Sequence, residues 1–425
     1  MMLSKIKNYC LCLLLFLLPW QTRLIFFNTS LGGYDWEYGR LSLYATEILL
    51  GFIILLALIE KFKNKYFTSR LSVLSRTRLL SVIFGLLLFF LVYLRLVSLS
   101  RETTWQYLNW VIYGFCLGVI IIESQWNFKK LSLALWSGSL LPAILAIHQF
   151  FTQSVLANKW LGIASQHPGQ LGVAVLDFGY ERWLRAYGSF GWPNALGIYL
   201  SVIFILGIIL IYKERTTKIQ AWLLIGQIVI LFGLFFSFAR GAWFALIAGC
   251  LILFFKHYRD KKFWPQFIFY ILMAVILLSI FKPLVFSRVN LDNRLEMRSI
   301  SQRLEQWQDF KIVFSQNKFF GVGPGAYTYG LFYYQLDHGH SFEPIHNIFL
   351  LFLGEWGIVG IGIFFSLIFF IRKKINWSFA PFWVLLLAGL FDHWSLSMFS
   401  GLMVLAVFFS LGIKYLAIDT QADPE

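Results

Sequence analysis

The chain has 425 residues, of which 59% are hydrophobic and 13% charged, and its formal net charge is +15. Soluble domains are about half apolar and a quarter charged, so this composition excludes an ordinary soluble protein and indicates an integral membrane protein. Most of the basic excess lies in short loops between apolar runs, where it meets anionic lipid headgroups. The net charge therefore predicts membrane lipids as partners and no nucleic acid.

Apolar runs of roughly 20 residues, enough to cross about 30 Å of hydrocarbon, recur along the whole chain. We expect an all-α protein with about twelve transmembrane helices, forming a single polytopic domain over 1–425. The expected spans are 8–27, 41–60, 79–97, 105–123, 131–151, 194–212, 220–238, 241–256, 266–283, 346–371, 379–396 and 399–417.

Lys and Arg collect in the loops on one side of these spans, and the positive-inside rule predicts that this side is cytoplasmic. The basic loops are then cytoplasmic, and so are both termini, including a short tail at 418–425. The N-terminus has a basic start and an apolar core but no small-residue cleavage site, so we expect it to be a retained first helix. All four cysteines fall inside predicted spans and are expected to be packing residues. The basic loops meant here are 61–78, 213–218, 256–262 and 372–374.

Two outer loops, 152–193 and 284–345, are much longer than a connector needs to be. The second contains Ile300, Leu304 and Trp307 at helical spacing, continued by Phe314. This stripe predicts an amphipathic helix lying on the membrane surface. Its other faces carry charged residues, namely Arg298, Arg303, Glu305 and Asp309.

His346 follows Pro344 and comes just before an apolar run, so we expect it in the first turn of the tenth span, at the outer interface. The helix dipole disfavours a positive charge there and favours the neutral imidazole that a general base must be. The competing interpretation is a histidine that caps the helix or anchors it among headgroups.

Arg240 lies in "FSFARGAWF", between two apolar spans with almost no loop. Its guanidinium is expected near the outer surface, where Gly241 and the start of the next helix add backbone N–H groups. These groups together predict a phosphate site, and the alternative is an arginine bound to a lipid phosphate. Arg185 and Arg303 could add positive charge to the same vestibule, and the alternative for each is a solvated surface charge, which is the usual state of a charge on a surface helix.

Other polar residues of the outer side give weaker signals. Asp337, His338, His340 and His346 are possible metal ligands, but a histidine pair separated by one glycine is a poor match to zinc-site spacing, and we expect no metal and no cofactor. Asp392 and His393 form a polar pair near the end of the eleventh span, where hydrogen bonding between helices would explain them.

Four ordered motifs between 188 and 360 resemble the O-antigen ligase and O-antigen polymerase superfamily of bacterial polytopic membrane proteins. Ala239 precedes Arg240 where the family usually has serine, and the first five spans resemble the family only in number and hydropathy. The motifs are "GSFGWPNALGIYL" (188–200), "FSFARGAWFALIAG" (236–249), "QRLEQWQDFKIVFSQNKFFGVGPGAY" (302–327), and "HN" followed by "GIVG" (357–360).

The resemblance implies a GT-C-like architecture and a metal-independent inverting glycosyltransfer at the outer face of the bacterial cytoplasmic membrane. The donor would be a glycan linked to undecaprenyl pyrophosphate, and the acceptor a hydroxyl of a sugar or lipid such as the lipid A core. His346 and Arg240 would be the catalytic residues. Pyrophosphate or glycan would be bound by Arg185, Arg298, Arg303 and Asn347.

Three interpretations stay open from the sequence. A ligase and a polymerase differ only in the acceptor, which the sequence does not name. A transporter or flippase would place polar residues near the bilayer midplane, where this chain has few beyond Arg95 and Glu355.

Overall fold

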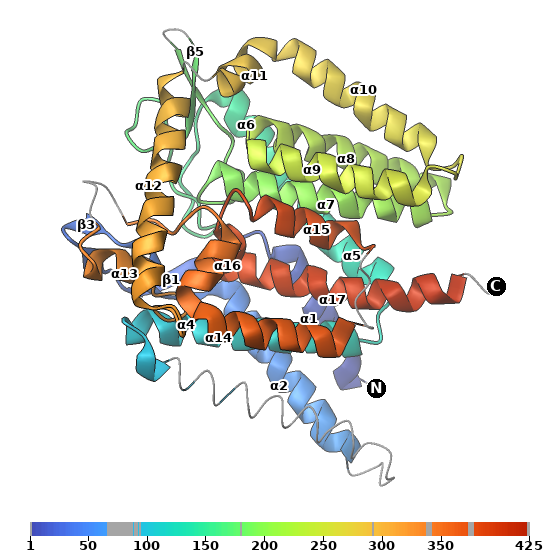
Figure 1. Cartoon of the computed structure of the whole chain (residues 1–425). Coiled ribbons are helices and arrows are strands. Elements are labelled where there is room, and N and C mark those ends of the chain that lie inside the picture. The colour runs from blue at the N-terminus through green and yellow to red at the C-terminus, as the bar shows by residue number, and fades with distance from the viewer. Residues whose placement is uncertain are drawn as a thin grey trace.

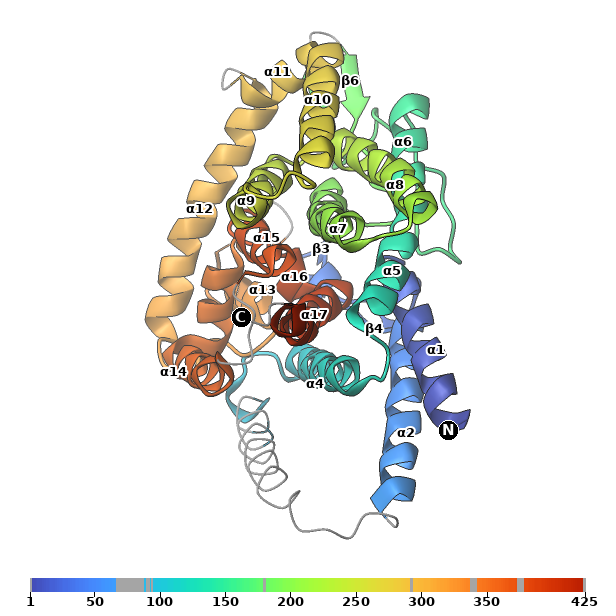
Figure 2. The same ribbon diagram turned by 90° about the vertical axis from the view of Figure 1, so that its right-hand side faces the viewer.

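The computed structural model describes residues 2–65, 88, 92, 95–178, 181–290, 293–336, 342–372 and 378–422. Helices that run alongside one another make up most of it (Figure 1). Three pairs of short antiparallel strands and several short helices gather at one end of this bundle, and both termini lie at the other end (Figures 1 and 2). This arrangement is compatible with the expectation that both termini lie on one side of the membrane, which stays a prediction.

Seven helical segments of the described chain are long and apolar enough to cross a membrane, and each overlaps one of the expected spans. An eighth, α10 (Trp264–Ile280), qualifies only together with the bent helices that follow it. The seven are α4 (Arg101–Glu123), α5 with α6 (Phe128–Gly138 and Leu140–Thr152), α7 (Pro193–Lys213), α8 (Thr217–Phe236), α9 (Arg240–His257), α14 (Ile348–Ile371) and α17 (Phe399–Ala422).

The expected first span, 8–27, is wrong in its second half. The helix α1 (Met2–Leu17) ends before Pro19, and Arg23–Phe27 form strand β1. Aromatic and β-branched side chains favour a strand here, and β1 pairs with β4 (Leu41–Tyr44). The second span likewise begins as β4 and continues as α2 (Ala45–Lys65). The expected span 79–97 lies largely outside the described residues.

The expected span 379–396 is not one helix. The chain forms α15 (Ala380–Ala388), turns, and then forms the single-turn helix α16 (Trp394–Ser397). The break is polar, because Asp392 Oδ1 accepts a hydrogen bond from the Trp394 backbone N–H at 2.9 Å. Because the Asp392 side chain accepts a hydrogen bond from a nearby backbone N–H, the chain turns here instead of extending α15.

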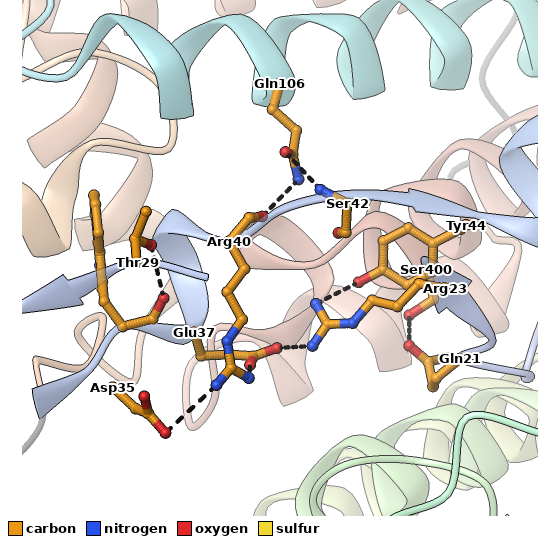
Figure 3. A network of polar contacts seen from close by, with 11 residues as sticks. Gln21, Arg23, Thr29, Asp35, Glu37, Arg40, Ser42, Tyr44, Gln106 and Ser400 are labelled. Carbon is orange, nitrogen blue, oxygen red and sulfur yellow. Dashed lines mark hydrogen bonds and ion pairs between the residues drawn. The ribbon is translucent and has the colours of Figure 1, made fainter. Parts of the chain in front are cut away.

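The segment between β1 and β4 folds over the bundle end as a small polar network (Figure 3). Glu37 pairs with both Arg23 and Arg40, and Gln106 of α4 bonds the backbone on both sides of Leu41. Trp36 reaches further and donates its indole N–H to Thr328 Oγ1 at 2.9 Å. The elements of this segment are β2 (Ser30–Leu31), β3 (Tyr34–Asp35) and the 3-10 helix η1 (Glu37–Gly39).

Helix α7 is the centre of the fold. Every residue from Ala195 to Ile211 is buried, as expected for a helix that is apolar all round. Figure 2 shows α7 between α8, α9, α15 and α5, and it contacts each of them. The first residues of α7 therefore hold a fixed position at the strand-bearing end of the bundle.

Helix α12 (Arg294–Gln316) crosses that end and joins α11 (Lys282–Val289) to α13 (Tyr327–Tyr333) (Figure 1). A helix thus forms where the surface helix was predicted, and its apolar stripe is exposed: Leu304 is 62% and Trp307 50% accessible. Its polar face turns inward, with Glu296 and Asp309 buried. This division of faces is the one expected of a helix that lies on a membrane surface.

Helix α14 contains one break, at Gly357, where φ is +63°. A Cβ at this position would lie 2.3 Å from the Phe319 carbonyl oxygen, so only glycine fits. The segment after α12 docks on the break, because Ile358 and Val359 donate their N–H groups to the Lys318 and Phe319 carbonyls. The "GIVG" motif therefore fixes α12 to α14.

Candidate active site

A large cavity opens at the strand-bearing end of the bundle, with a volume of about 1150 Å³. Its walls come from the first long loop, from the starts of α7 and α9, and from α12 and the turn after α15. Three carboxylates, Asp177, Glu343 and Asp392, lie among the described lining residues. Arginines outnumber them, namely Arg182, Arg185, Arg240, Arg288, Arg294, Arg298 and Arg303. The cavity is therefore suited to an anion with more than one charge.

Arg185 follows β6 (Glu181–Leu184), which pairs with β5 (Val175–Phe178), and its side chain is buried. Nε donates to the Ser237 carbonyl at 2.9 Å, and Nη2 donates to Asn194 Oδ1 at 2.7 Å. Burial and the neighbouring Arg288 lower the pKa of Arg185 to about 9, so the guanidinium stays charged at neutral pH. Asn194 in turn donates to Asp392 Oδ2 at 3.1 Å.

Arg240 is the first residue of α9, and a three-residue turn separates it from α8. Phe238 in that turn has φ of +46°, a conformation that is rare for a bulky residue, and it is fully buried among aromatic rings. The Arg240 side chain forms an ion pair with Glu296, with 2.6 Å between Nη2 and Oε2, and Nη1 donates to the Arg288 carbonyl at 2.8 Å. The turn formed by residues 237–239, fixed by the packing of Phe238, thus positions Arg240 in the cavity wall.

Arg288 and Glu296 were not predicted as site residues from the sequence. Glu296 has a side chain only 2% accessible, and it pairs with both Arg288 and Arg240. Burial lowers the pKa of Arg288 to about 10, which leaves it charged, while Glu296 opposes that shift. The helical period could have found Glu296, because it lies seven residues before Arg303 on the same face of α12.

Arg303 donates from Nη2 to the Phe391 carbonyl at 3.3 Å, which joins α12 to the turn after α15. Burial and the like charge of Arg240 lower its pKa. Three further arginines, Arg182, Arg294 and Arg298, are exposed at the cavity wall. The cavity therefore has a group of buried or half-buried arginines held by hydrogen bonds and ion pairs, and an exposed group at its rim.

His346 is not among the residues that line the cavity, but it is coupled electrostatically to Asp392, which is. Its backbone N–H donates to Gln306 Oε1 at 3.2 Å, and its Nδ1 lies 3.0 Å from the same oxygen. The His393 ring packs edge-on against the His346 ring, with 5.1 Å between centroids. Gln306 and Arg303 are one turn apart on α12, so the histidine stands directly beside the arginine cavity.

The expected place of His346 in the first turn of α14 is wrong by two residues. Helix α14 begins at Ile348, and Asn347 is the N-cap, with Oδ1 accepting the Phe349 and Leu350 N–H groups. The short amide side chain of asparagine reaches these N–H groups from the N-cap position, where it is among the preferred residues. Asn347 Nδ2 donates to the Leu390 carbonyl at 3.3 Å, so the amide expected to bind substrate is occupied by backbone contacts.

Asp392 and His393 are both buried in the turn between α15 and α16. Burial lowers the pKa of His393 to about 4, so its ring is neutral at pH 7, and its Nδ1 lies 2.7 Å from Ser397 Oγ. Burial alone would raise the pKa of Asp392, but the neighbouring imidazoles and two hydrogen bonds hold it below its usual value. Asp337, His338 and His340 lie outside the described residues.

The segment that carries Arg240, Arg303 and His346 matches a known family. Residues 225–365 match the family model described as O-antigen ligase. The superfamily resemblance seen in the motifs is thereby confirmed over this segment. The matched segment also contains Arg288, Glu296 and Gln306, whereas Arg185 lies outside it. No curated protein matched the chain.

Proposed function

We propose that this chain is a metal-independent inverting glycosyltransferase of the O-antigen ligase type. It moves a glycan from an undecaprenyl-pyrophosphate carrier to an acceptor hydroxyl, on the lipid A core or an equivalent molecule. The reaction takes place at the outer face of the bacterial cytoplasmic membrane, in a vestibule formed by the outer loops 152–193 and 284–345. The match of residues 225–365 to the O-antigen ligase model supports the family-level part of this proposal.

The arrangement that carries the proposal is the arginine cavity beside His346. A pyrophosphate leaving group develops negative charge as its bond to the sugar breaks, and groups that stabilise such charge in place lower the barrier. Arg185, Arg240, Arg288 and Arg303 are buried or half-buried at one wall and are held by hydrogen bonds or ion pairs. One guanidinium group can donate two parallel hydrogen bonds to the oxygens of a phosphate. The arginines can therefore stabilise the negative charge of the leaving group without a divalent ion.

The chemistry follows as a single displacement. The acceptor hydroxyl gives its proton to the His346 imidazole while its oxygen bonds to the anomeric carbon. The bond from that carbon to the phosphate oxygen breaks, and its electron pair leaves with undecaprenyl pyrophosphate. Attack opposite the leaving group inverts the anomeric centre, and a base of this kind contributes about 10²- to 10⁴-fold in rate.

The location of the charges supports transfer rather than transport. Transporters bind substrate near the bilayer midplane on broken helices. Here the arginines gather at one end of the helices, and the buried Glu355 of α14 accepts N–H groups from Gly325 and Tyr327. Its contacts are therefore those of a residue that fixes the loop before α13.

The test compares the lipid-linked glycans of cells with and without this protein, together with their finished surface polymer. Loss of transfer with long lipid-linked chains retained is the result that the proposal expects. Single repeats accumulating on the carrier would assign a polymerase instead, and loss of outward-facing donor would assign a flippase. Transfer by the purified protein in the presence of a chelator then tests metal independence, and a strict requirement for a divalent ion would contradict it.

A further inference from the structure

We propose that Gln306 is a positioning residue that sets the tautomer of His346 and leaves Nε2 as its basic nitrogen. The inference rests on the proposed function, in which His346 takes the acceptor proton. Gln306 has no charge, and nothing in its residue type marks it as functional. Its contacts with His346 carry the argument.

The orientation of the Gln306 amide is fixed by the backbone. The His346 main-chain N–H can only donate, and it lies 3.2 Å from Gln306 Oε1. The amide oxygen, rather than the amide nitrogen, must therefore face His346, which settles the usual ambiguity between the two ends of a glutamine side chain. A carbonyl oxygen has two lone pairs, so the same atom can accept a second hydrogen bond.

The second hydrogen bond comes from the imidazole. His346 Nδ1 lies 3.0 Å from Gln306 Oε1, and this oxygen can only accept, so Nδ1 must carry a hydrogen. A neutral imidazole has one N–H group, and the hydrogen bond at one nitrogen determines the state of the other. The ring is therefore held with a lone pair on Nε2, which alone can take a proton from the acceptor hydroxyl.

The other polar groups near His346 are engaged elsewhere, so Gln306 is the residue that we assign to setting the tautomer of His346. His393 contacts the His346 ring, but its own Nδ1 faces Ser397 Oγ at 2.7 Å, and burial keeps it neutral at pH 7. Asp392 is a nearby negative charge, and its oxygens accept hydrogen bonds from Asn194 Nδ2 and the Trp394 backbone N–H. Tyr38 of η1 packs against the far ring, that of His393. The positive charge on the α12 side is Arg303, one turn before Gln306.

A neutral acceptor suits this task better than a carboxylate. An ionised glutamate at position 306 would favour the imidazolium and so remove the base at neutral pH. The amide orders the ring without adding charge. Because Arg303 and Gln306 lie on one face of α12, the same helix places a cation beside the leaving group and orders the base for the acceptor.

The test uses the full-length protein in lipid nanodiscs and three variants. Gln306→Met keeps the size of the side chain but removes the acceptor. Gln306→Glu keeps an acceptor oxygen and adds a charge. Gln308→Met is the matched control, because Gln308 lies on the exposed side of the same helix. Each protein is assayed for transfer across pH and is labelled with ¹⁵N-histidine for NMR, with His346→Asn used to assign the His346 signals.

We expect the His346 signals of the parent and of Gln308→Met to show protonated Nδ1 and unprotonated Nε2. Gln306→Met should lose this pattern and lower the maximal rate by about 10- to 10²-fold, less than the roughly 10⁴-fold that a fully enforced wrong tautomer costs, because without Gln306 the ring still spends part of its time with Nε2 unprotonated. Gln306→Glu should keep the tautomer and recover the rate at high pH, with the acid limb of the pH–rate profile moved to higher pH.

Two results would overturn the inference: a Gln306→Met protein that keeps the Nδ1–H pattern, or one that loses activity while Gln306→Glu neither recovers rate nor moves the profile. Failure of the proposed function looks different. In that case His346→Asn transfers at the parental rate, whatever tautomer the parent shows.

Discussion

Glu296 of α12 lies 2.6 Å from Arg240 of α9, with its other oxygen paired to Arg288, so a buried carboxylate stands behind two arginines of the cavity wall. An internal anion in this place holds two guanidinium groups in position, and it also competes with a phosphate for them. The pair therefore links the stability of the outer helix to the affinity of the cavity for its substrate.

The first prediction concerns this carboxylate. Glu296→Gln should tighten binding of inorganic pyrophosphate roughly tenfold, because the arginines lose their internal counter-charge, and it should lower the melting temperature. Glu305→Gln on the same helix is the control and should change neither quantity. Calorimetric titration and thermal melting of the purified proteins give both numbers. Unchanged pyrophosphate affinity in Glu296→Gln would show that Glu296 does not compete for Arg240.

Arg240 is expected to bind the donor through both prongs of its guanidinium. Arg240→Ala should weaken donor binding by roughly 10²-fold, and Arg240→Lys should restore only part of it, since a point charge cannot copy a fork. Arg298→Ala, at the exposed rim, should cost less than about threefold. The affinity of each of the three purified variants for the donor, measured by titration, gives the ranking of these losses. An equal loss of donor affinity in Arg240→Ala and Arg298→Ala would contradict the assignment of donor binding to the cavity wall rather than to its exposed rim.

His393 makes stability depend on pH. Its pKa falls from 6.5 to about 4 on folding, so between these values the unfolded chain binds a proton that the folded chain does not. Stability should therefore fall as the pH is lowered from 6.5 toward 4, by at most about 3 kcal/mol at 1.36 kcal/mol per unit. His393→Gln should remove this slope. Melting at pH 7 and pH 5 measures it, and an equal slope in the variant would place its origin elsewhere.

The sequence indicated most of the arginines of the candidate site, but it did not indicate the residues that contact them. Arg185, Arg240, Arg298 and Arg303 were expected to share a vestibule, and they line one cavity. Glu296 was missed although the helical period places it on the face of α12 that carries Arg303. Arg288 was missed because the contact that joins it to Arg240 depends on how α11 and α12 cross the bundle end. Long-range pairing of this kind leaves no local spacing to read.

Other differences have local physical causes. The run Arg23–Phe27 is apolar enough to extend a span, but it follows a proline and finds a strand partner in β4, so it leaves the helix. Asp392 and His393 were recognised as a polar pair, yet hydropathy over 379–396 hid the break that they cause. The helical spacing of the apolar residues of α12 was predicted correctly. That its polar face lines a cavity could be seen only in the three-dimensional structure.

The expected topology can be tested at two exposed positions. In a background without the four natural cysteines, Lys218→Cys at the start of α8 and Ser315→Cys near the end of α12 should react with an impermeant thiol reagent from opposite sides. Intact and opened cells or vesicles separate the two sides. Labelling of both positions from outside would contradict the cytoplasmic assignment of the basic loops.

The central claim is that His346 takes the acceptor proton while the arginine cavity holds the donor. The most direct measurement is the transfer rate of His346→Ala at saturating donor, taken together with its donor affinity, with His167→Ala in the outer loop as an exposed-histidine control. The account predicts a rate at least about 10²-fold lower at unchanged donor affinity, and a control that behaves as the parent. Transfer by His346→Ala at the parental rate would contradict it.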